Sequence, residues 1–310
     1  MDLFAQAPDR VSIYEVSPRD GLQNEAVMIP IEGKKRLINS LVNAGLKRIE
    51  ITSFVSPKWV PQLADAEELA STLKPPPGVT FGALCPNAKG LERALSAGLS
   101  EIAVFLSASE THNKMNINKT IDDTLSVFHE IVPPAREKGL AVRAYVSTVW
   151  GCPYEGPIDP KKVLSIAKRL IDLGCYQVSL GDTIGVGTPR QTDLIVRMFR
   201  DEMPLSRIAL HLHDTRGTAL SNIVVGLQLG VRDFDSSVAG VGGCPYAPGA
   251  AGNVATEDLI YLMNGMGIET GVDLEGVIEA GRVAEEVIGR QLPGKVHKAG
   301  AFKLRKARTA

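Results

Sequence analysis

The chain alternates short β-branched apolar runs with longer segments in which apolar residues recur at helical spacing. The short runs predict strands over residues 11–16, 47–51, 79–84, 101–106, 141–147, 176–180, 207–213 and 233–238. The longer segments predict helices over residues 31–43, 62–73, 88–97, 121–138, 160–173, 189–202, 219–229 and 256–264. Glycine, which commonly ends a helix, stands just after four of these segments, as Gly45, Gly98, Gly174 and Gly230.

Two further features complete this pattern. Pro133 and Pro134 fall inside the segment 121–138, so its helix is expected to be interrupted or bent there. Residues 274–288 continue the helical spacing beyond the last strand and predict one or two extra helices.

Eight successive strand–helix units predict a parallel sheet with crossover helices, and eight is the number that closes a β/α barrel. An open doubly wound sheet is the alternative, but it predicts a glycine-rich phosphate turn after the first strand. Residues 17–21 read Ser-Pro-Arg-Asp-Gly there instead. We therefore expect an α/β fold, a (β/α)8 TIM barrel with extra C-terminal helices. Residues 1–310 would form one domain, with the barrel over about 11–265 and a helical extension over about 266–300.

Composition narrows the range of partners. The 310 residues are 44% hydrophobic, enough for one large core. The 34 basic and 35 acidic residues nearly cancel, which argues against a nucleic-acid partner because such a partner calls for a basic face. The basic residues near the C-terminus are interpreted as a solvated tail. No segment reaches the roughly 18 uninterrupted apolar residues of a membrane helix, so no membrane partner is expected.

The cysteines indicate a reducing setting. Cys85, Cys152, Cys175 and Cys244 form no Cys-x-x-Cys pair and are too few for a disulfide scaffold. The first ten residues lack the shape of a signal peptide. We therefore expect a cytoplasmic protein.

A His-Leu-His sequence gives the sharpest chemical signal. In a barrel the chemistry lies at the C-terminal ends of the strands, and His211 and His213 stand at such an end. Residues two apart on a strand face the same side, so both imidazoles can bind one cation. The alternative is a pair of core histidines, each of which needs a polar partner. A single cation satisfies both rings at once.

Asp20 follows the first strand and is the natural anionic third ligand, since strands one and seven can meet across the barrel mouth. It could instead cap the turn before Gly21. Asn253 could add an amide oxygen or cap a helix. Such a mixed nitrogen and oxygen set suits Mg²⁺ or Mn²⁺, with Co²⁺ and Zn²⁺ as alternatives.

Two more residues suit proton and charge transfer. Arg19, beside Asp20, is the kind of fixed cation that a developing enolate requires, although it could also form a surface salt bridge. Cys244 lies in a glycine-rich loop that can move as a lid, and its thiol can carry a proton. The alternative for Cys244 is a buried, inert cysteine. The other three cysteines are interpreted as structural.

Long motifs tie these residues to a known family. Residues 17–25, Ser-Pro-Arg-Asp-Gly-Leu-Gln-Asn-Glu, resemble the opening of the metal-dependent lyase and Claisen-condensing barrels. Residues 52–61, 151–156, 179–189 and 238–259 resemble, within that family, the 3-hydroxy-3-methylglutaryl-CoA lyases. The resemblance extends from about residue 11 to residue 300.

The resemblance implies a role for each matching position. Four residues would hold Mg²⁺ or Mn²⁺, namely Asp20, His211, His213 and Asn253. Arg19 would stabilise the enolate, Cys244 would be the acid/base thiol, and Asp20 or a histidine such as His211 would be the base. Substrate, loop and the surroundings of the metal would be oriented by Glu50, Asp182 and Glu257. Gln23 and Ser53 would contact the substrate or support the site.

The implied reaction is the retro-Claisen cleavage of 3-hydroxy-3-methylglutaryl-CoA, an acyl-CoA, to acetyl-CoA and acetoacetate. Barrels of this size often pair through extra C-terminal helices, so we expect a homodimer. Ala26 and Arg216 depart from the animal enzymes and leave the acyl group open, so a citramalyl-CoA lyase is an alternative. A condensing synthase usually carries extra domains, and a non-catalytic barrel needs no such set of residues at its strand ends. Phe302 stands near the position of the animal regulatory cysteine, so a thiol switch is not expected.

Overall fold

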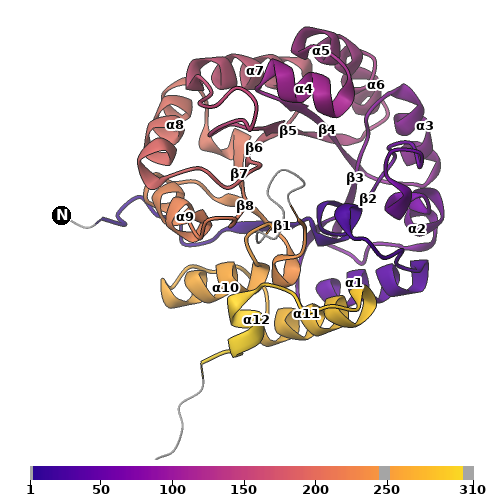
Figure 1. Ribbon diagram of the computed structural model, residues 1–310, viewed down its shortest axis with the longest axis vertical. Helices are drawn as coiled ribbons and strands as arrows, with labels where there is room; N and C mark the ends of the chain where they lie inside the picture. Colours follow the sequence, from indigo (N-terminus) through magenta and orange to yellow (C-terminus); the bar gives the residue numbers. More distant parts are fainter. Residues whose placement is uncertain (1–2, 244–251, 303–310) are drawn as a thin grey trace, which may run out of the picture.

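The computed structural model describes residues 3–243 and 252–302, and within them eight parallel strands close into a barrel in chain order. Figure 1 shows the helices as a ring around these strands. The strands are β1 (Ser12–Glu15), β2 (Arg48–Ser53), β3 (Thr80–Leu84), β4 (Glu101–Ser107), β5 (Ala141–Ser147), β6 (Gln177–Asp182), β7 (Ile208–Leu212) and β8 (Asp233–Ser236). Each strand pairs in parallel with the next, and β8 pairs with β1. The predicted (β/α)8 barrel is confirmed.

Helices connect the strands and extend beyond the last of them. They are α1 (Ile31–Asn43), α2 (Ala66–Thr72), α3 (Ala88–Ser96), α4 (Glu110–Ile117), α5 (Ile121–His129), α6 (Val132–Glu137), α7 (Pro160–Leu173), α8 (Pro189–Glu202), α9 (Ala219–Gln228), α10 (Thr256–Gly265), α11 (Leu274–Ile288) and α12 (Lys295–Ala299). The bounds of α1, α7, α8 and α11 are those predicted. Local signals explain this agreement, since α8 begins with a capping box between Thr188 and Gln191 and α7 ends at the left-handed Gly174.

Three helical segments need comment. The segment 121–138 is interrupted near its prolines, as predicted, and forms two helices, α5 and α6, because the prolines stand in the first turn of a new helix. Helix α4 was missed because its mostly polar sequence, Glu-Thr-His-Asn-Lys-Met-Asn-Ile, carries little apolar periodicity; its start is set by the Ser109 side chain, which accepts the His112 N–H. The segment 62–73 is a short 3₁₀ turn, Pro61–Leu63, followed by α2.

Two regions of the barrel differ in character. A large apolar core fills the space between strands and helices. The barrel interior instead holds polar side chains at alternating strand positions, among them Tyr14, Glu101, Arg143 and Asp235, all buried. We call the last two, with Gln177 and Ser179, the interior polar cluster.

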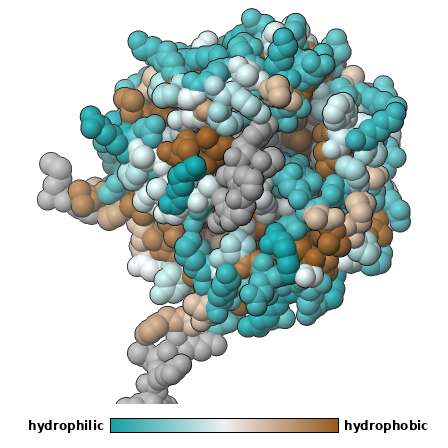
Figure 2. Space-filling model, viewed as in Figure 1, coloured by the Kyte–Doolittle hydropathy of each residue, from teal (hydrophilic) through white to brown (hydrophobic). Residues whose placement is uncertain are grey.

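The added C-terminal helices lie against the barrel ring on one side of the molecule, where α11 packs along α1 and α12 packs on α10 (Figure 1). The face drawn in Figure 2 is mostly hydrophilic, with separate hydrophobic patches. No helix in the described ranges has the length and apolar character needed to span a bilayer. Cys85, Cys152 and Cys175, which lie in those ranges, are buried and free of disulfides.

Gly82 on β3 gives a test of the polar barrel interior. The Tyr14 hydroxyl donates to the Glu101 carboxylate at 2.6 Å, and a Cβ at Gly82 would lie 2.4 Å from that hydroxyl oxygen. We expect Gly82→Ala to lower the free energy of unfolding by about 1–3 kcal/mol, because the buried pair must shift. Urea titration followed by circular dichroism measures the change.

Gly265→Ala is the matched control, because a Cβ there meets open space at the end of α10. A Gly82→Ala protein as stable as this control would contradict the tight fit of the Tyr14–Glu101 pair.

Candidate metal centre

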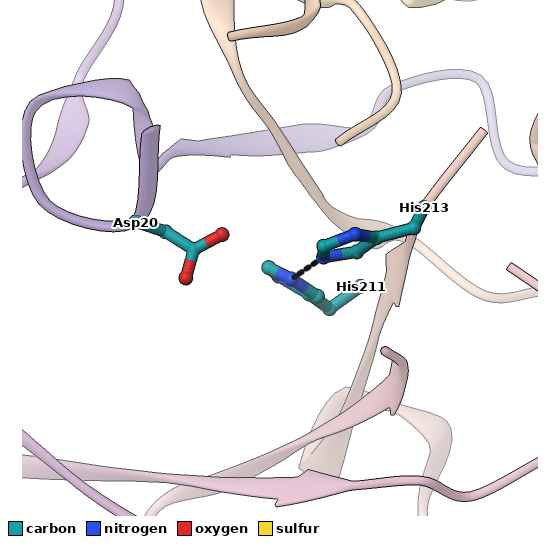
Figure 3. Close-up of side chains that lie close together, drawn as sticks. All are labelled: Asp20, His211 and His213. Atoms are coloured by element: carbon teal, nitrogen blue, oxygen red, sulfur yellow. Dashed lines mark hydrogen bonds between the residues drawn. The ribbon is translucent and has the colours of Figure 1, made fainter. Parts of the chain in front are cut away.

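Asp20, His211 and His213 meet at one end of the barrel. One ligand atom from each lies within 4.8 Å of the others, and Figure 3 shows the Asp20 carboxylate directed toward the two imidazole rings. Asp20 comes from η1 (Ser17–Gly21), a π-helical turn directly after β1. His211 lies on β7 and His213 follows its last residue. The closed barrel therefore brings together residues that are about two-thirds of the chain apart.

The two histidines face the same side because strand side chains alternate. Their Nε2 atoms lie 3.3 Å apart and their ring centroids 5.3 Å apart (Figure 3). His213 continues the strand direction far enough to form an antiparallel bridge with Asn253. This bridge places the segment that precedes α10 beside the candidate metal ligands.

The charge states of Asp20 and His213 suit a cation. Burial alone would raise the pKa of Asp20, but the charges of Arg19, His211 and His213 lower it to about 2. Burial, followed by the charge of His211, lowers the pKa of His213 to about 4. An ionised carboxylate and neutral imidazoles are the forms in which these side chains bind metals.

The residues present fit a small divalent cation. Two neutral imidazole nitrogens 3.3 Å apart can share only one proton, and the Asp20 carboxylate faces both. His213 Nδ1 is buried and has no hydrogen-bond partner among the described residues. A cation between the two rings would replace the contact of the two nitrogens with two nitrogen–metal bonds.

Asn253 and Gln23 both hold Asp20. Asn253 Nδ2 donates to Asp20 Oδ2 at 2.8 Å, and Gln23 Nε2 donates to Asp20 Oδ1 at 2.9 Å. Gly242, with a φ of +116°, makes room for Asn253, since a Cβ there would lie 2.7 Å from Asn253 Nδ2. The structure thus brings Asn253 next to Asp20, with its amide nitrogen directed at the carboxylate.

Arg19 is buried, with 6% of its surface exposed, so its interpretation as a surface salt bridge is excluded. Its Nε donates to Glu50 Oε2 at 2.5 Å and its Nη1 to Asp20 Oδ1 at 2.7 Å. The guanidinium also lies 5.3 Å from the centre of the Tyr145 ring. Glu50 lies within β2 rather than at its end, and its Oε1 has no partner in the described ranges. Arg19 therefore connects Asp20, a candidate metal ligand, to a buried carboxylate.

Three other predicted site residues make their hydrogen bonds elsewhere. Both carboxylate oxygens of Asp182 accept backbone N–H groups of the loop after β6, at 3.0 and 2.8 Å. Ser53 Oγ accepts the Val55 N–H at 3.2 Å. Glu257 Oε2 accepts the Ala239 N–H at 2.9 Å, and burial raises the pKa of Glu257 to about 8. Through these contacts the three residues hold loops around the site.

Cys244 lies outside the described residues, but the two ends of the segment that contains it are defined. The backbones of Gly242 and Gly252 touch, because a Cβ on Gly252 would lie 1.1 Å from the Gly242 carbonyl oxygen. Asn24 Nδ2 donates to the Gly243 carbonyl at 3.2 Å. Burial raises the pKa of Cys85 and raises that of Cys175 to about 12, which agrees with a structural interpretation of these two thiols.

Sequence reasoning missed the interior residues behind the ligands. Asp235 on β8 contacts His211, Arg143 on β5 pairs with Asp235, and the Tyr145 hydroxyl donates to Glu50 at 3.2 Å. The available signal was the period of two in β5, where Arg143 and Tyr145 alternate with apolar residues. The sequence prediction considered only the C-terminal ends of the strands, so it did not include these interior positions.

Comparison with known proteins agrees with this geometry. The HMGL-like family model matches residues 10–284. A Mus musculus relative named "3-hydroxy-3-methylglutaryl-CoA lyase, cytoplasmic" is 51% identical over 292 residues, 94% of this chain and 85% of the relative. A Pseudomonas aeruginosa relative named "3-hydroxy-3-isohexenylglutaryl-CoA/hydroxy-methylglutaryl-CoA lyase" is 50% identical over 292 residues, 94% of this chain and 97% of the relative.

A solved structure gives the same result. The crystal structure of hydroxymethylglutaryl-CoA lyase from Pseudomonas aeruginosa matches with a TM-score of 0.93 and 49% identity. The match covers 95% of this chain and 98% of that one. Because the family model spans most of the sequence and relatives share about half of its residues, the chain belongs to the HMGL-like family.

Proposed function

We propose that this protein is a divalent-metal-dependent carbon–carbon lyase that cleaves 3-hydroxy-3-methylglutaryl-CoA to acetyl-CoA and acetoacetate. The observation that carries the proposal is the convergence of Asp20, His211 and His213 beside the buried Arg19. The names of the relatives point to the same substrate.

The metal would be Mg²⁺ or Mn²⁺, held by Asp20, His211, His213 and Asn253. When bound, it supplies Lewis acidity toward the hydroxyl and carboxylate oxygens of the substrate. Asn253 now presents its amide nitrogen to Asp20, and a half-turn of that amide directs its oxygen to the same place. Gln23 keeps Asp20 in position through its own hydrogen bond.

The chain's residues would then move charge and protons. A base must take the proton of the 3-hydroxyl, and Asp20 or an assisting histidine would be that base. Arg19, fixed by Glu50, balances the negative charge that develops on the thioester oxygen as the carbon–carbon bond breaks. Cys244 would return a proton to the enolate carbon, which releases acetyl-CoA.

Other residues would support this chemistry indirectly. Asp182 and Glu257 would fix the loops after β6 and β8, and Ser53 the turn after β2. We further propose that residues 1–310 act as one catalytic domain, in the cytoplasm, as a homodimer without nucleic-acid or membrane partners. The relatives' names include both cytoplasmic and mitochondrial forms.

The acyl group is the open part of the proposal. The Pseudomonas relative is named for two substrates that differ in the group on carbon 3. Ala26 is exposed, and Arg216 donates to the Ile184 carbonyl at 2.7 Å, so both departures from the animal enzymes lie in loops that follow strands. A lyase for a related substrate such as citramalyl-CoA keeps the same metal ligands and is the second candidate.

An assay with a panel of acyl-CoA thioesters tests the reaction. With Mg²⁺ or Mn²⁺, we expect equal amounts of acetyl-CoA and acetoacetate from 3-hydroxy-3-methylglutaryl-CoA, measured by liquid chromatography. EDTA should abolish turnover and added metal should restore it, since the Lewis acid is lost and regained. Turnover that is insensitive to EDTA, or cleavage of citramalyl-CoA alone, would argue against the proposal.

Arg19→Met tests the charge-balancing role. We expect kcat to fall by on the order of 10²–10³, the usual effect of removing one charge-stabilising donor, while one metal ion per chain is retained. Steady-state kinetics and elemental analysis measure the two quantities. Arg197→Met, a surface change on α8, is the control. Near-normal turnover in Arg19→Met refutes the role.

His213→Ala tests ligation. Loss of an imidazole from the set should leave the purified protein with substoichiometric Mn²⁺ after dialysis, as elemental analysis measures. His129→Ala on the exposed side of α5 serves as the control and should keep its metal. Equal metal content in both variants would remove His213 from the ligand set.

A further inference from the structure

His211 has a second contact on the side away from His213. Its Nδ1 lies 3.2 Å from Asp235 Oδ2, which comes from the neighbouring strand β8 at the register position opposite His211. The Asp235 side chain has no exposed surface. Asp235 is therefore a buried carboxylate directly behind a predicted metal ligand.

The interior polar cluster keeps Asp235 ionised and fixed in direction. Arg143 donates to both of its oxygens, with Nη2 to Oδ1 at 2.6 Å and Nη1 to Oδ2 at 3.0 Å. Ser179 Oγ donates to Oδ2 at 2.7 Å, and Gln177 Oε1 accepts from Arg143 Nε at 3.0 Å. The Arg143–Asp235 contact is therefore a buried bidentate ion pair. Such a bidentate pair fixes geometry as well as charge.

An ionised carboxylate can only accept hydrogen bonds, so the His211 nitrogen that faces it must carry the proton. With the proton on Nδ1, the lone pair of neutral His211 is on Nε2, the atom directed to His213. We propose that Asp235 is a positioning residue that sets the tautomer and ring orientation of His211 for the metal, and that Arg143 and Ser179 hold Asp235 for this task. This inference rests on the metal site of the proposed function.

The two histidines are then unequal ligands. His213 Nδ1 has no hydrogen-bond partner in the described part of the chain, so no comparable carboxylate orients that ring. Asp235 sets the His211 ring in place before a metal binds. The His213 ring has its contact with His211 Nε2, and a bound metal would be its next partner. Loss of the Asp235 contact should therefore weaken metal binding even though every ligand is still present.

Two variants of the cluster test this role through the affinity for Mn²⁺. Ser179→Ala removes one hydrogen bond to Asp235 and keeps the Arg143–Asp235 pair, so we expect the Kd to rise a few-fold. Asp235→Asn removes the ionised acceptor, and the Kd should rise by about 10- to 100-fold. Electron paramagnetic resonance of free Mn²⁺ gives both constants without substrate, and the visible spectrum of the Co²⁺-loaded protein reports the ligand geometry.

Asp233→Asn is the matched control. Asp233 lies two residues earlier on β8 and also pairs with an arginine, Arg48, at 3.1 Å, but it contacts no histidine in the described structure. Its Mn²⁺ affinity and Co²⁺ spectrum should equal those of the unchanged protein. A purely structural role of Asp235 predicts lower thermal stability with an unchanged Kd in the folded protein.

The outcomes separate clearly. A folded Asp235→Asn protein with the unchanged Kd and Co²⁺ spectrum overturns the inference. If that variant does not fold, because Arg143 loses its buried partner, Ser179→Ala and Arg143→Lys decide, and unchanged values in both overturn it. Failure of the unchanged protein to bind Mn²⁺ overturns the inference together with the metal site. Mn²⁺ binding without cleavage of 3-hydroxy-3-methylglutaryl-CoA overturns only the proposed reaction.

Discussion

Charged side chains inside a closed barrel have little water around them, so each one needs a partner of opposite charge or a set of hydrogen bonds. In this protein the pairs are Arg143 with Asp235, and Arg19 with Glu50 and Asp20. Removing one member would leave its partner buried and unpaired, so the loss of either member of a pair destabilises the fold. The position of the candidate metal ligands depends on these pairs, because Asp20 contacts Arg19 and His211 contacts Asp235.

The same pairs connect the middle of the barrel to its rim. Arg19 lies between a carboxylate of β2 and a carboxylate of η1, so the turn after β1 is held from inside as well as by its own backbone. Asp235 does the same for His211 from β8. Buried carboxylates of β2 and β8, Glu50 and Asp235, thus hold the candidate site from inside the barrel. Asp182 and Glu257 hold the loops around it through hydrogen bonds to backbone N–H groups.

The sequence was most informative where local signals and long periodicity agree. The bounds of α7 followed from Pro160 at the start and Gly174 at the end, whereas α4 was missed because a polar helix has no apolar stripe. At the site, His211 and His213 were readable from their spacing. The link from His211 to Asp235 was not, because register between β7 and β8 depends on tertiary packing that a single sequence does not specify.

The contact between Gly242 and Gly252 has a consequence for the substitutions that this rim tolerates. A Cβ at Gly252 would overlap the Gly242 carbonyl oxygen, and a Cβ at Gly242 would press on the Asn253 amide, so neither position accepts a larger residue. Because Asn253 directly follows Gly252 and donates to Asp20, a side chain at either glycine would push the amide away from the carboxylate. The absence of a side chain at these two positions is thus a condition for the shape of the candidate site, although neither glycine has a side chain to offer it.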